Sequence, residues 1–172
     1  IPQQLRAMLA AVARGACLPD RLRFIAVGGA PVAQELLLQA ERAGLPVYQG
    51  YGLSEAVSVV ALNTPGANRT GSVGRPLPGV TARIAPDGEI LLQGTLFAGY
   101  LGDRAAQHAE LATGDLGRLD GDGYLYVTGR KKNAYATAYG RNVSPEWIES
   151  ELQSQPPIAQ AVVFGEASPV NV

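Results

Sequence analysis

Two apolar runs that each end in glycine lie on either side of a helical pattern near the start of the chain. The first, LRFIAVGG, spans residues 22–29, and the second, LPVYQGYG, spans residues 45–52. Between them apolar residues recur at helical spacing from Leu36 to Ala43, and Pro31 suits a first helical turn. The pattern predicts a βαβ unit, whose two strands are parallel and end at the same edge of a sheet.

The segment from Gly71 to Gly129 has a different pattern, in which short apolar runs alternate with glycine turns. VTARIA, PDG and EILLQG predict one hairpin, and LGRLD, GDG and YLYVTGR predict a second. No long helical pattern interrupts them, so this part of the chain is expected to be rich in β-structure.

A third pattern follows the basic triplet at residues 130–132. NAYATAYG, residues 133–140, alternates like a strand, and SPEWIESELQ predicts a helix with Ser144 as its N-cap. Trp147 is expected to pack this helix onto a sheet, and residues 158–165, IAQAVVFG, are expected to form a closing strand.

The charge balance excludes some classes of partner. The chain has fourteen Lys and Arg and fifteen Asp and Glu, which gives a net charge of −1. A dedicated nucleic-acid or anionic-membrane surface needs a basic excess. Cys17 is the single cysteine, which rules out an internal disulfide and favours a reducing, cytoplasmic setting. No apolar run approaches the roughly 18 residues of a membrane span, and no secretory leader is expected.

The end of the second apolar run carries groups suited to a nucleotide. In YQGYGLSE, Tyr51 could stack on a flat ring, Ser54 could donate to a phosphate oxygen, and Glu55 could hold Mg²⁺ through carboxylate oxygen. The alternative is a core tyrosine between two glycine turns, followed by a solvated acid at a helix start. The stretch alone leaves both interpretations open.

Two further residues have possible ligand roles. The carboxylate of Asp115, in LATGDLGRL, can accept hydrogen bonds from both hydroxyls of a ribose diol, although a Gly-Asp turn entering a strand is common without function. Arg130 ends a predicted strand, where its guanidinium could hold a phosphate or ribose oxygen or simply be solvated.

The order of the motifs is more specific than any one of them. VGGAPV, YQGYGLSE, GSVGRPLPGV, GEILLQG, GYLGD, LATGDLGRLDGDGYLYVTGRKK and YGRNVSPEWIESEL resemble the superfamily of adenylate-forming enzymes, over about Asp20 to Phe164. That superfamily includes acyl-CoA synthetases, firefly luciferase-like enzymes and peptide-synthetase adenylation domains. Its members activate a carboxylic acid with ATP and Mg²⁺ to an acyl-adenylate and then usually pass the acyl group to a thiol such as that of CoA.

The resemblance implies a role for each matching residue. Ser54, where the family most often has Thr, and Glu55 are implied as catalytic residues at the α-phosphate and at Mg²⁺ respectively. The remaining ATP- or AMP-binding positions are implied at the adenine and its backbone bed (Gly29, Ala30, Pro31, Gln49, Gly50, Tyr51, Gly52) and at the ribose (Asp115, Arg130). Small residues at Val27, Gly28 and Gly50 would border the acyl pocket.

The fold class implied is α/β, with the end of a large N-terminal domain followed by a small α+β domain. Residues 1–70 would belong to the nucleotide-binding part, 71–129 to a β-rich subdomain, 130–132 to a hinge at Lys132, and 133–172 to the start of the small domain. The small domain would swing about Lys132 between an adenylating and a thiolating pose.

The resemblance also implies that part of the machinery lies elsewhere. The family's phosphate loop would precede Ile1 and its adenylation lysine would follow Val172, so the chain is expected to be an inactive part of an AMP-forming acid–CoA ligase. GRNVSPEWIESEL favours a fatty acid as substrate. Two alternatives are an adenylation domain of a synthetase assembly line and a non-catalytic nucleotide-binding module.

Overall fold

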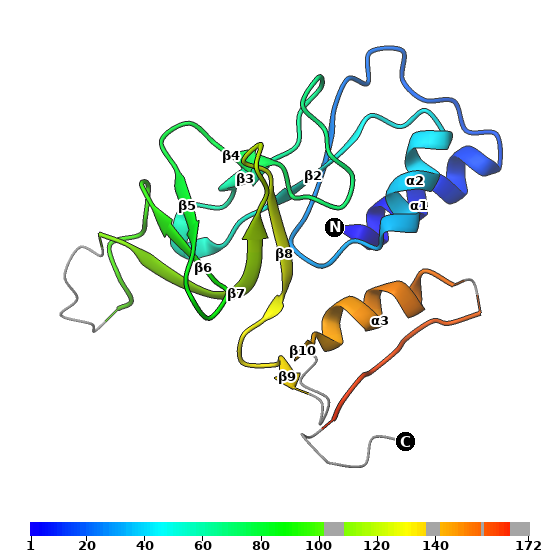
Figure 1. Cartoon of the computed structure of the whole chain (residues 1–172). Helices are drawn as coiled ribbons and strands as arrows, with labels where there is room; N and C mark the ends of the chain where they lie inside the picture. The colour runs from blue at the N-terminus through cyan, green and yellow to red at the C-terminus, as the bar shows by residue number, and fades with distance from the viewer. Residues whose placement is uncertain (102–108, 137–141, 156, 166–172) are drawn as a thin grey trace.

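The computed structural model describes residues 1–101, 109–136, 142–155 and 157–165. Two helices and a small mixed sheet form the N-terminal part, a four-stranded antiparallel sheet lies beside them, and a third helix lies below both (Figure 1). None of the helices in these described ranges is long and apolar enough to cross a membrane.

The N-terminal part contains the βαβ unit that the sequence predicts. The unit consists of β1 (Ile25–Val27), α2 (Gln34–Arg42) and β2 (Val47–Tyr51), and the helix α1 (Pro2–Ala13) precedes it. β1 and β2 pair in parallel, with Val27 opposite Gln49, which confirms the expected arrangement. Leu5 of α1 and Leu36 of α2 are buried with Val27 in one core cluster, so both helices cover the same side of these strands.

The predicted boundaries of this unit need two corrections. The first strand begins at Ile25, so residues 22–24 are not part of it, and the helix begins at Gln34, so Pro31 is not in its first turn. The reason for the late helix start is a bend: Gly29 has a φ of +76°, and Ala33 is still extended at ψ 137°. Residues 28–33 are therefore free to form a loop at the end of β1.

The first sheet continues with two short antiparallel strands, β3 (Ala61–Leu62) and β4 (Arg75–Pro76), in the order β1-β2-β3-β4. Gly74, just before β4, has a φ of +88°, and a Cβ there would lie 1.9 Å from the carbonyl carbon of Leu62. Only glycine allows the backbone of β4 to approach β3 this closely.

The second sheet consists of β5 (Thr81–Ile84), β6 (Glu89–Gln93), β7 (Leu111–Leu119) and β8 (Leu125–Arg130), all antiparallel and in sequence order. Both predicted hairpins are present. A buried cluster joins this sheet to the first one, since Ile90, Leu92 and Leu125 pack with Val60 and Ala61. The two sheets therefore share a core, and the end of β2 lies against the second sheet.

Polar contacts also join the sheets at the turn between β7 and β8. Arg69, in the loop between β3 and β4, makes ion pairs with Asp120 (2.5 Å) and Asp122 (2.8 Å) of that turn. Its guanidinium also lies 4.2 Å from the ring centroid of Tyr124. The acids of LDGDGYL thus serve as partners of Arg69 in a tight turn.

The small C-terminal part contains β9 (Tyr135–Ala136), β10 (Asn142–Val143) and α3 (Pro145–Gln153). Of the described residues of the predicted strand at 133–140, those at 135–136 form strand, and its residues 137–140 lie outside the described ranges. The prediction of a strand at 158–165 is wrong, because residues 158–165 form no β-ladder. The backbone N–H of Val163 instead donates a hydrogen bond to the carboxylate of Glu149.

The start of α3 is as predicted, with Pro145 after Ser144, but the capping chemistry differs. The Ser144 hydroxyl makes no capping bond to the helix backbone and lies 3.2 Å from the Glu146 carboxylate. Trp147 does not pack onto a sheet, because it points out of the helix and is 58% exposed.

The close approach at Gly74 makes a prediction about stability. Gly74→Ala combines an unfavourable left-handed φ with a backbone clash, so it should lower the free energy of unfolding by about 3–5 kcal/mol. Gly66→Ala is the matched control, because Gly66 has a φ of +81° but open space at its Cβ position; it should cost only about 1–2 kcal/mol. Urea unfolding followed by circular dichroism measures both, and equal losses would contradict the close-packing argument.

Candidate nucleotide site

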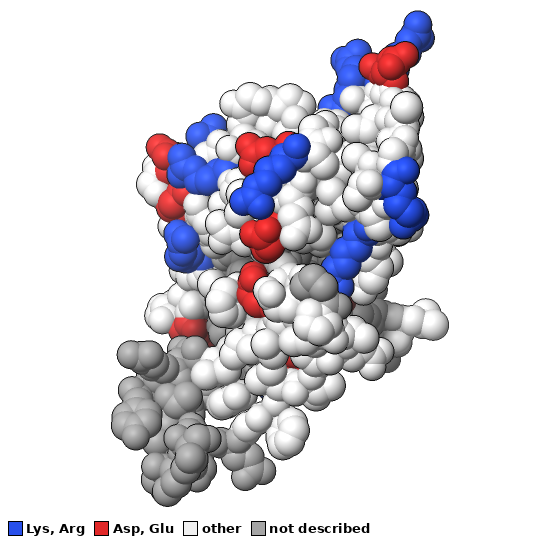
Figure 2. All heavy atoms as spheres, turned by 90° about the vertical axis from the view of Figure 1, so that its right-hand side faces the viewer, with Lys and Arg blue, Asp and Glu red and all other residues white. Residues whose placement is uncertain are grey.

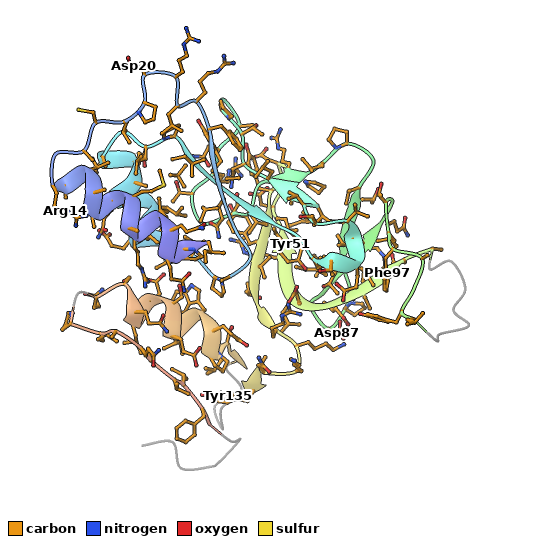
Figure 3. All side chains as sticks on the ribbon, turned by 180° about the vertical axis from the view of Figure 1, so that it is seen from behind. Arg14, Asp20, Tyr51, Asp87, Phe97 and Tyr135 are labelled. Atoms are coloured by element: carbon orange, nitrogen blue, oxygen red, sulfur yellow. The ribbon has the colours of Figure 1, made fainter. Side chains whose placement is uncertain are left out.

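Asp115 is a buried carboxylate held by residues from both sheets. It is 4% exposed, its Oδ2 accepts a 2.6 Å hydrogen bond from the Tyr51 hydroxyl, and its Oδ1 lies 2.8 Å from Nε of Arg130. Burial and the hydrogen bond to Asp115 raise the pKa of Tyr51, so its phenol stays a neutral donor. Figure 3 shows Tyr51 where the strands of the two sheets meet.

A bulge in β7 directs Asp115 toward Tyr51. Leu91 of β6 pairs with Ala112 of β7, and Glu89 pairs with Leu116. Two residues along β6 therefore correspond to four residues along β7, so β7 contains two extra residues. The buried Thr113 stabilises the bulge: its hydroxyl donates to the carbonyl of Ile90 at 2.8 Å and accepts the N–H of Asp115 at 3.1 Å. Bulges re-aim side chains in this way beside active sites.

Ser54 and Glu55 lie on a tight loop after β2, in a single 3₁₀ turn (Ser54–Ala56). A Cβ on Gly52 would lie 1.5 Å from the carbonyl oxygen of Ser58, so the loop folds directly back onto Gly52. Val57 and Ser58 have φ values of +55° and +84°, which are unfavourable for residues with a side chain. Such strain often accompanies a functional loop.

Glu55 presents an ionised carboxylate at the surface of this loop. Its Oε1 accepts a 2.7 Å hydrogen bond from Tyr100, and this bond is the main cause that lowers the pKa of Glu55. Its backbone carbonyl accepts the N–H of Phe97 at 2.8 Å, so residues 97–100 support the turn. The positive charge of Arg130 contributes to the lowered pKa of Glu55.

The chemistry of Glu55 fits Mg²⁺ bound together with a substrate. In the described parts of the chain no three His, Cys, Asp or Glu side chains gather as a metal site. Mg²⁺ is commonly bound by one or two carboxylates plus substrate phosphates, and a single, partly exposed, ionised carboxylate such as that of Glu55 suits that arrangement.

The residues predicted around the adenine lie at the ends of the two parallel strands. Gly29, Ala30 and Pro31 are exposed on the loop after β1, beside the end of β2. A Cβ on Gly28 would lie 2.6 Å from the carbonyl oxygen of Gly50, so the two strand ends are in direct contact.

The proposed acyl-pocket residues are in this same region. Val27 is 3% exposed beneath the helices, and a Cβ on Gly50 would lie 2.7 Å from Leu62. Close packing alone accounts for glycine at positions 28 and 50. Their role toward an acyl chain stays a prediction.

The structure brings Tyr51, Asp115 and Arg130 into one bonded group and places Glu55 near it. Sequence reasoning missed the residues that support this group: Thr113, Tyr100, Glu89 and Lys131. Thr113, two positions before Asp115, offered the clearest signal, since a hydroxyl can bond the N–H two residues on. Lys131 was assigned only to the hinge motif, whereas its amine contacts Asp87 and Glu89 of the second sheet.

On the face seen in Figure 2, basic and acidic side chains alternate and form no large patch of one sign. Several charges of the chain are paired, including Arg42 with Glu35 and Arg83 with Glu110. Such a mixed face does not suit a polyanion, which needs a basic excess.

The fold is α/β, and it brings the parallel strand ends, a buried carboxylate and a glycine-bounded loop together at the edge where such folds hold their ligands. The model of the AMP-binding enzyme family matches residues 1–101. The chain belongs to that family.

Several known proteins resemble the chain over most of its length. It is 43% identical to long-chain-fatty-acid–CoA ligase FadD15 of Mycobacterium bovis over 160 residues, which are 90% of this chain and 27% of that ligase. It is 34% identical to 2-succinylbenzoate–CoA ligase of Bacillus subtilis, over 86% of this chain and 34% of that protein. The chain therefore spans about a third or less of these curated relatives.

Solved structures agree with this relationship. The o-succinylbenzoate CoA synthetase of Bacillus subtilis in complex with AMP superposes with a TM-score of 0.82 at 31% identity, covering 97% of this chain and 37% of that one. The same enzyme with the acyl-adenylate intermediate gives a TM-score of 0.80 at 32% identity, over 94% of this chain and 37% of that one. The α/β fold and the adenylate-forming family predicted from the sequence are confirmed.

The bond between Tyr51 and Asp115 makes a prediction about stability. Tyr51→Phe keeps the ring but removes the donor to a buried carboxylate, so the free energy of unfolding should fall by about 1–3 kcal/mol. Tyr48→Phe is the control: its ring stacks on Phe24 at 4.9 Å, and its hydroxyl has no hydrogen-bond partner among the described residues. That change should cost less than about 0.5 kcal/mol. Chemical denaturation at neutral pH measures both, and equal effects would contradict the account.

Proposed function

We propose that the chain is part of an AMP-forming acid–CoA ligase, which activates a carboxylic acid with ATP to an acyl-adenylate and transfers the acyl group to CoA. The observation that carries the proposal is the Asp115 carboxylate, held by Tyr51 and Arg130 where the two sheets meet. Family membership and the CoA-ligase names of the relatives support the same activity.

In this proposal Asp115 binds the ribose. Each carboxylate oxygen can accept two hydrogen bonds. Among the described residues, Oδ2 of Asp115 accepts one from Tyr51, and Oδ1 is in an ion pair with Arg130. One position on each oxygen is then left for a hydroxyl of the ribose diol. The adenine would lie between Tyr51 and the loop of Gly29, Ala30 and Pro31, over the backbone of Gln49, Gly50 and Gly52.

The phosphates would lie on the side of Ser54 and Glu55. The Ser54 hydroxyl would donate to the α-phosphate, and Glu55 would hold Mg²⁺, which neutralises phosphate charge when bound. Arg130, about half exposed, adds positive charge next to the ribose. Each of these groups stabilises or orients the nucleotide rather than reacting with it.

The substrate and the setting follow from weaker observations. Identity to a long-chain-fatty-acid–CoA ligase favours a fatty acid, bordered by Val27, Gly28 and Gly50. Lys132 would be the hinge between the adenylating and CoA-transferring poses. The exposed, unpaired Cys17 favours a reducing, cytoplasmic location.

Two other functions remain as outcomes of experiment. An adenylation domain of an assembly line would transfer the acyl group to a carrier protein and not to free CoA. A non-catalytic module would bind AMP but show no ATP–pyrophosphate exchange in the full-length protein. The ligase is expected to show exchange and to require both a fatty acid and CoA for turnover.

The ribose assignment is tested by calorimetry with AMP and 2′,3′-dideoxy-AMP on the full-length protein. Asp115→Asn should weaken AMP binding about 10- to 100-fold, because a charged acceptor is lost, while dideoxy-AMP binding changes little. Asp122→Asn, an exposed partner of Arg69, is the control and should change neither. Unchanged AMP affinity in Asp115→Asn would make the ribose assignment wrong.

The metal assignment is tested through Glu55→Gln, which keeps the acceptor for Tyr100 but removes the charge. The Mg²⁺ concentration that gives half-maximal pyrophosphate exchange should rise about tenfold or more, since Mg²⁺ prefers carboxylate ligands. Binding of AMP without metal should stay the same. Glu35→Gln on α2, whose carboxylate also accepts side-chain hydrogen bonds, is the control; an equal Mg²⁺ dependence in both variants would contradict the assignment.

A further inference from the structure

Gly114, the residue before Asp115, is hydrogen-bonded through both its backbone N–H and its backbone carbonyl. Its N–H donates to Oε1 of Glu89 at 2.9 Å, and its carbonyl accepts the N–H of Lys131 at 2.8 Å. Gly114 has a φ of +71° and nothing within 4 Å of its Cβ position, so steric packing does not fix it. These two hydrogen bonds are the contacts that the described residues make with the backbone of Gly114.

Glu89 and Lys131 are also bonded to each other. The other carboxylate oxygen of Glu89 lies 2.7 Å from the amine of Lys131, which also lies 2.6 Å from Asp87. The Glu89 side chain is 12% exposed, so little water competes for its oxygens. The hydrogen bond from Lys131, and then that from Gly114, lower the pKa of Glu89 and keep it ionised.

The position of this pair in the chain connects it to the candidate ribose site. Gly114 precedes Asp115, and Lys131 follows Arg130, while Asp115 and Arg130 face each other across β7 and β8. A bulge leaves backbone groups of the ladder unpaired, and Glu89 accepts one of them. Asp87, the second partner of Lys131, lies in the turn between β5 and β6 and is labelled in Figure 3.

We propose that Glu89 and Lys131 are positioning residues that hold the β7 bulge in the shape in which Asp115 can accept the ribose diol. The proposal rests on the proposed function, because it concerns the same nucleotide site. Neither residue contacts the nucleotide. They act through Gly114, whose freedom would otherwise let the Asp115 carboxylate turn away from Tyr51 and Arg130.

The pair also sets where the rigid part of β8 ends. Lys131 is fixed by its backbone N–H and by its amine, and the next residue, Lys132, is the predicted hinge. A swing of the small domain about Lys132 then leaves Asp115 and Arg130 in place. The nucleotide site keeps its geometry in both poses.

The test compares AMP with 2′,3′-dideoxy-AMP by calorimetry on the full-length protein. Glu89→Ala should weaken AMP binding about tenfold, because the Gly114 N–H loses its acceptor, and should change dideoxy-AMP binding by less than about twofold. Glu89→Gln keeps the shape and an acceptor oxygen but loses the charge, so its loss for AMP should be smaller. Lys131→Met should weaken AMP binding, and Lys131→Arg should restore most of it.

Glu110→Gln is the matched control, since Glu110 pairs with Arg83 on the same sheet but away from the bulge; its affinities should not change. Equal losses for AMP and dideoxy-AMP in the Glu89 variants would overturn the proposal, because general damage affects both ligands. Unchanged AMP affinity would overturn it too. If Asp115→Asn does not weaken AMP binding relative to dideoxy-AMP binding, the ribose assignment is wrong, and so is the positioning proposal that rests on it. If Asp115→Asn weakens AMP binding selectively and the Glu89 variants do not, only the positioning proposal is wrong.

Discussion

The hydrogen bond from Tyr51 and the ion pair with Arg130 at the Asp115 carboxylate are the interactions on which the rest of the site depends. A carboxylate that is 4% exposed is strongly destabilising unless donors satisfy it. The hydrogen-bond donor, Tyr51, ends β2 in the first sheet, and the ion-pair partner, Arg130, ends β8 in the second. The same contacts that stabilise the buried carboxylate therefore also fix the relative position of the two strand ends at the proposed nucleotide site.

The shared core and the glycines make this meeting possible. Ile90 and Leu125 pack against Val60 and Ala61, which brings the two sheets close enough for Tyr51 to reach Asp115. Gly52 lets the loop with Ser54 and Glu55 fold back beside them. The left-handed φ of Val57 shows that this loop is held in a costly conformation, consistent with a shape selected for binding rather than for stability.

Much of the fold was predictable from the sequence because its elements have clear periods. The βαβ unit, both hairpins and α3 follow from apolar spacing and turn residues. The start of α2 was not predicted, because it depends on the bend at Gly29. The strand predicted at 158–165 is absent because this apolar segment has no pairing partner among the described residues. The roles of Tyr51 and Asp115 came from the order of motifs. Glu89 and Lys131 were missed because a bulge arises from the register between two strands, which no single stretch of sequence contains.

The most direct measurement of the central claim is a crystal structure of the full-length protein with AMP. The account predicts that both ribose hydroxyls lie within hydrogen-bonding distance of the Asp115 carboxylate, which keeps its bonds to Tyr51 and Arg130. It also predicts the adenine beside Tyr51 and the loop after β1. A ribose bound away from Asp115, with the nucleotide held elsewhere on the protein, would contradict it.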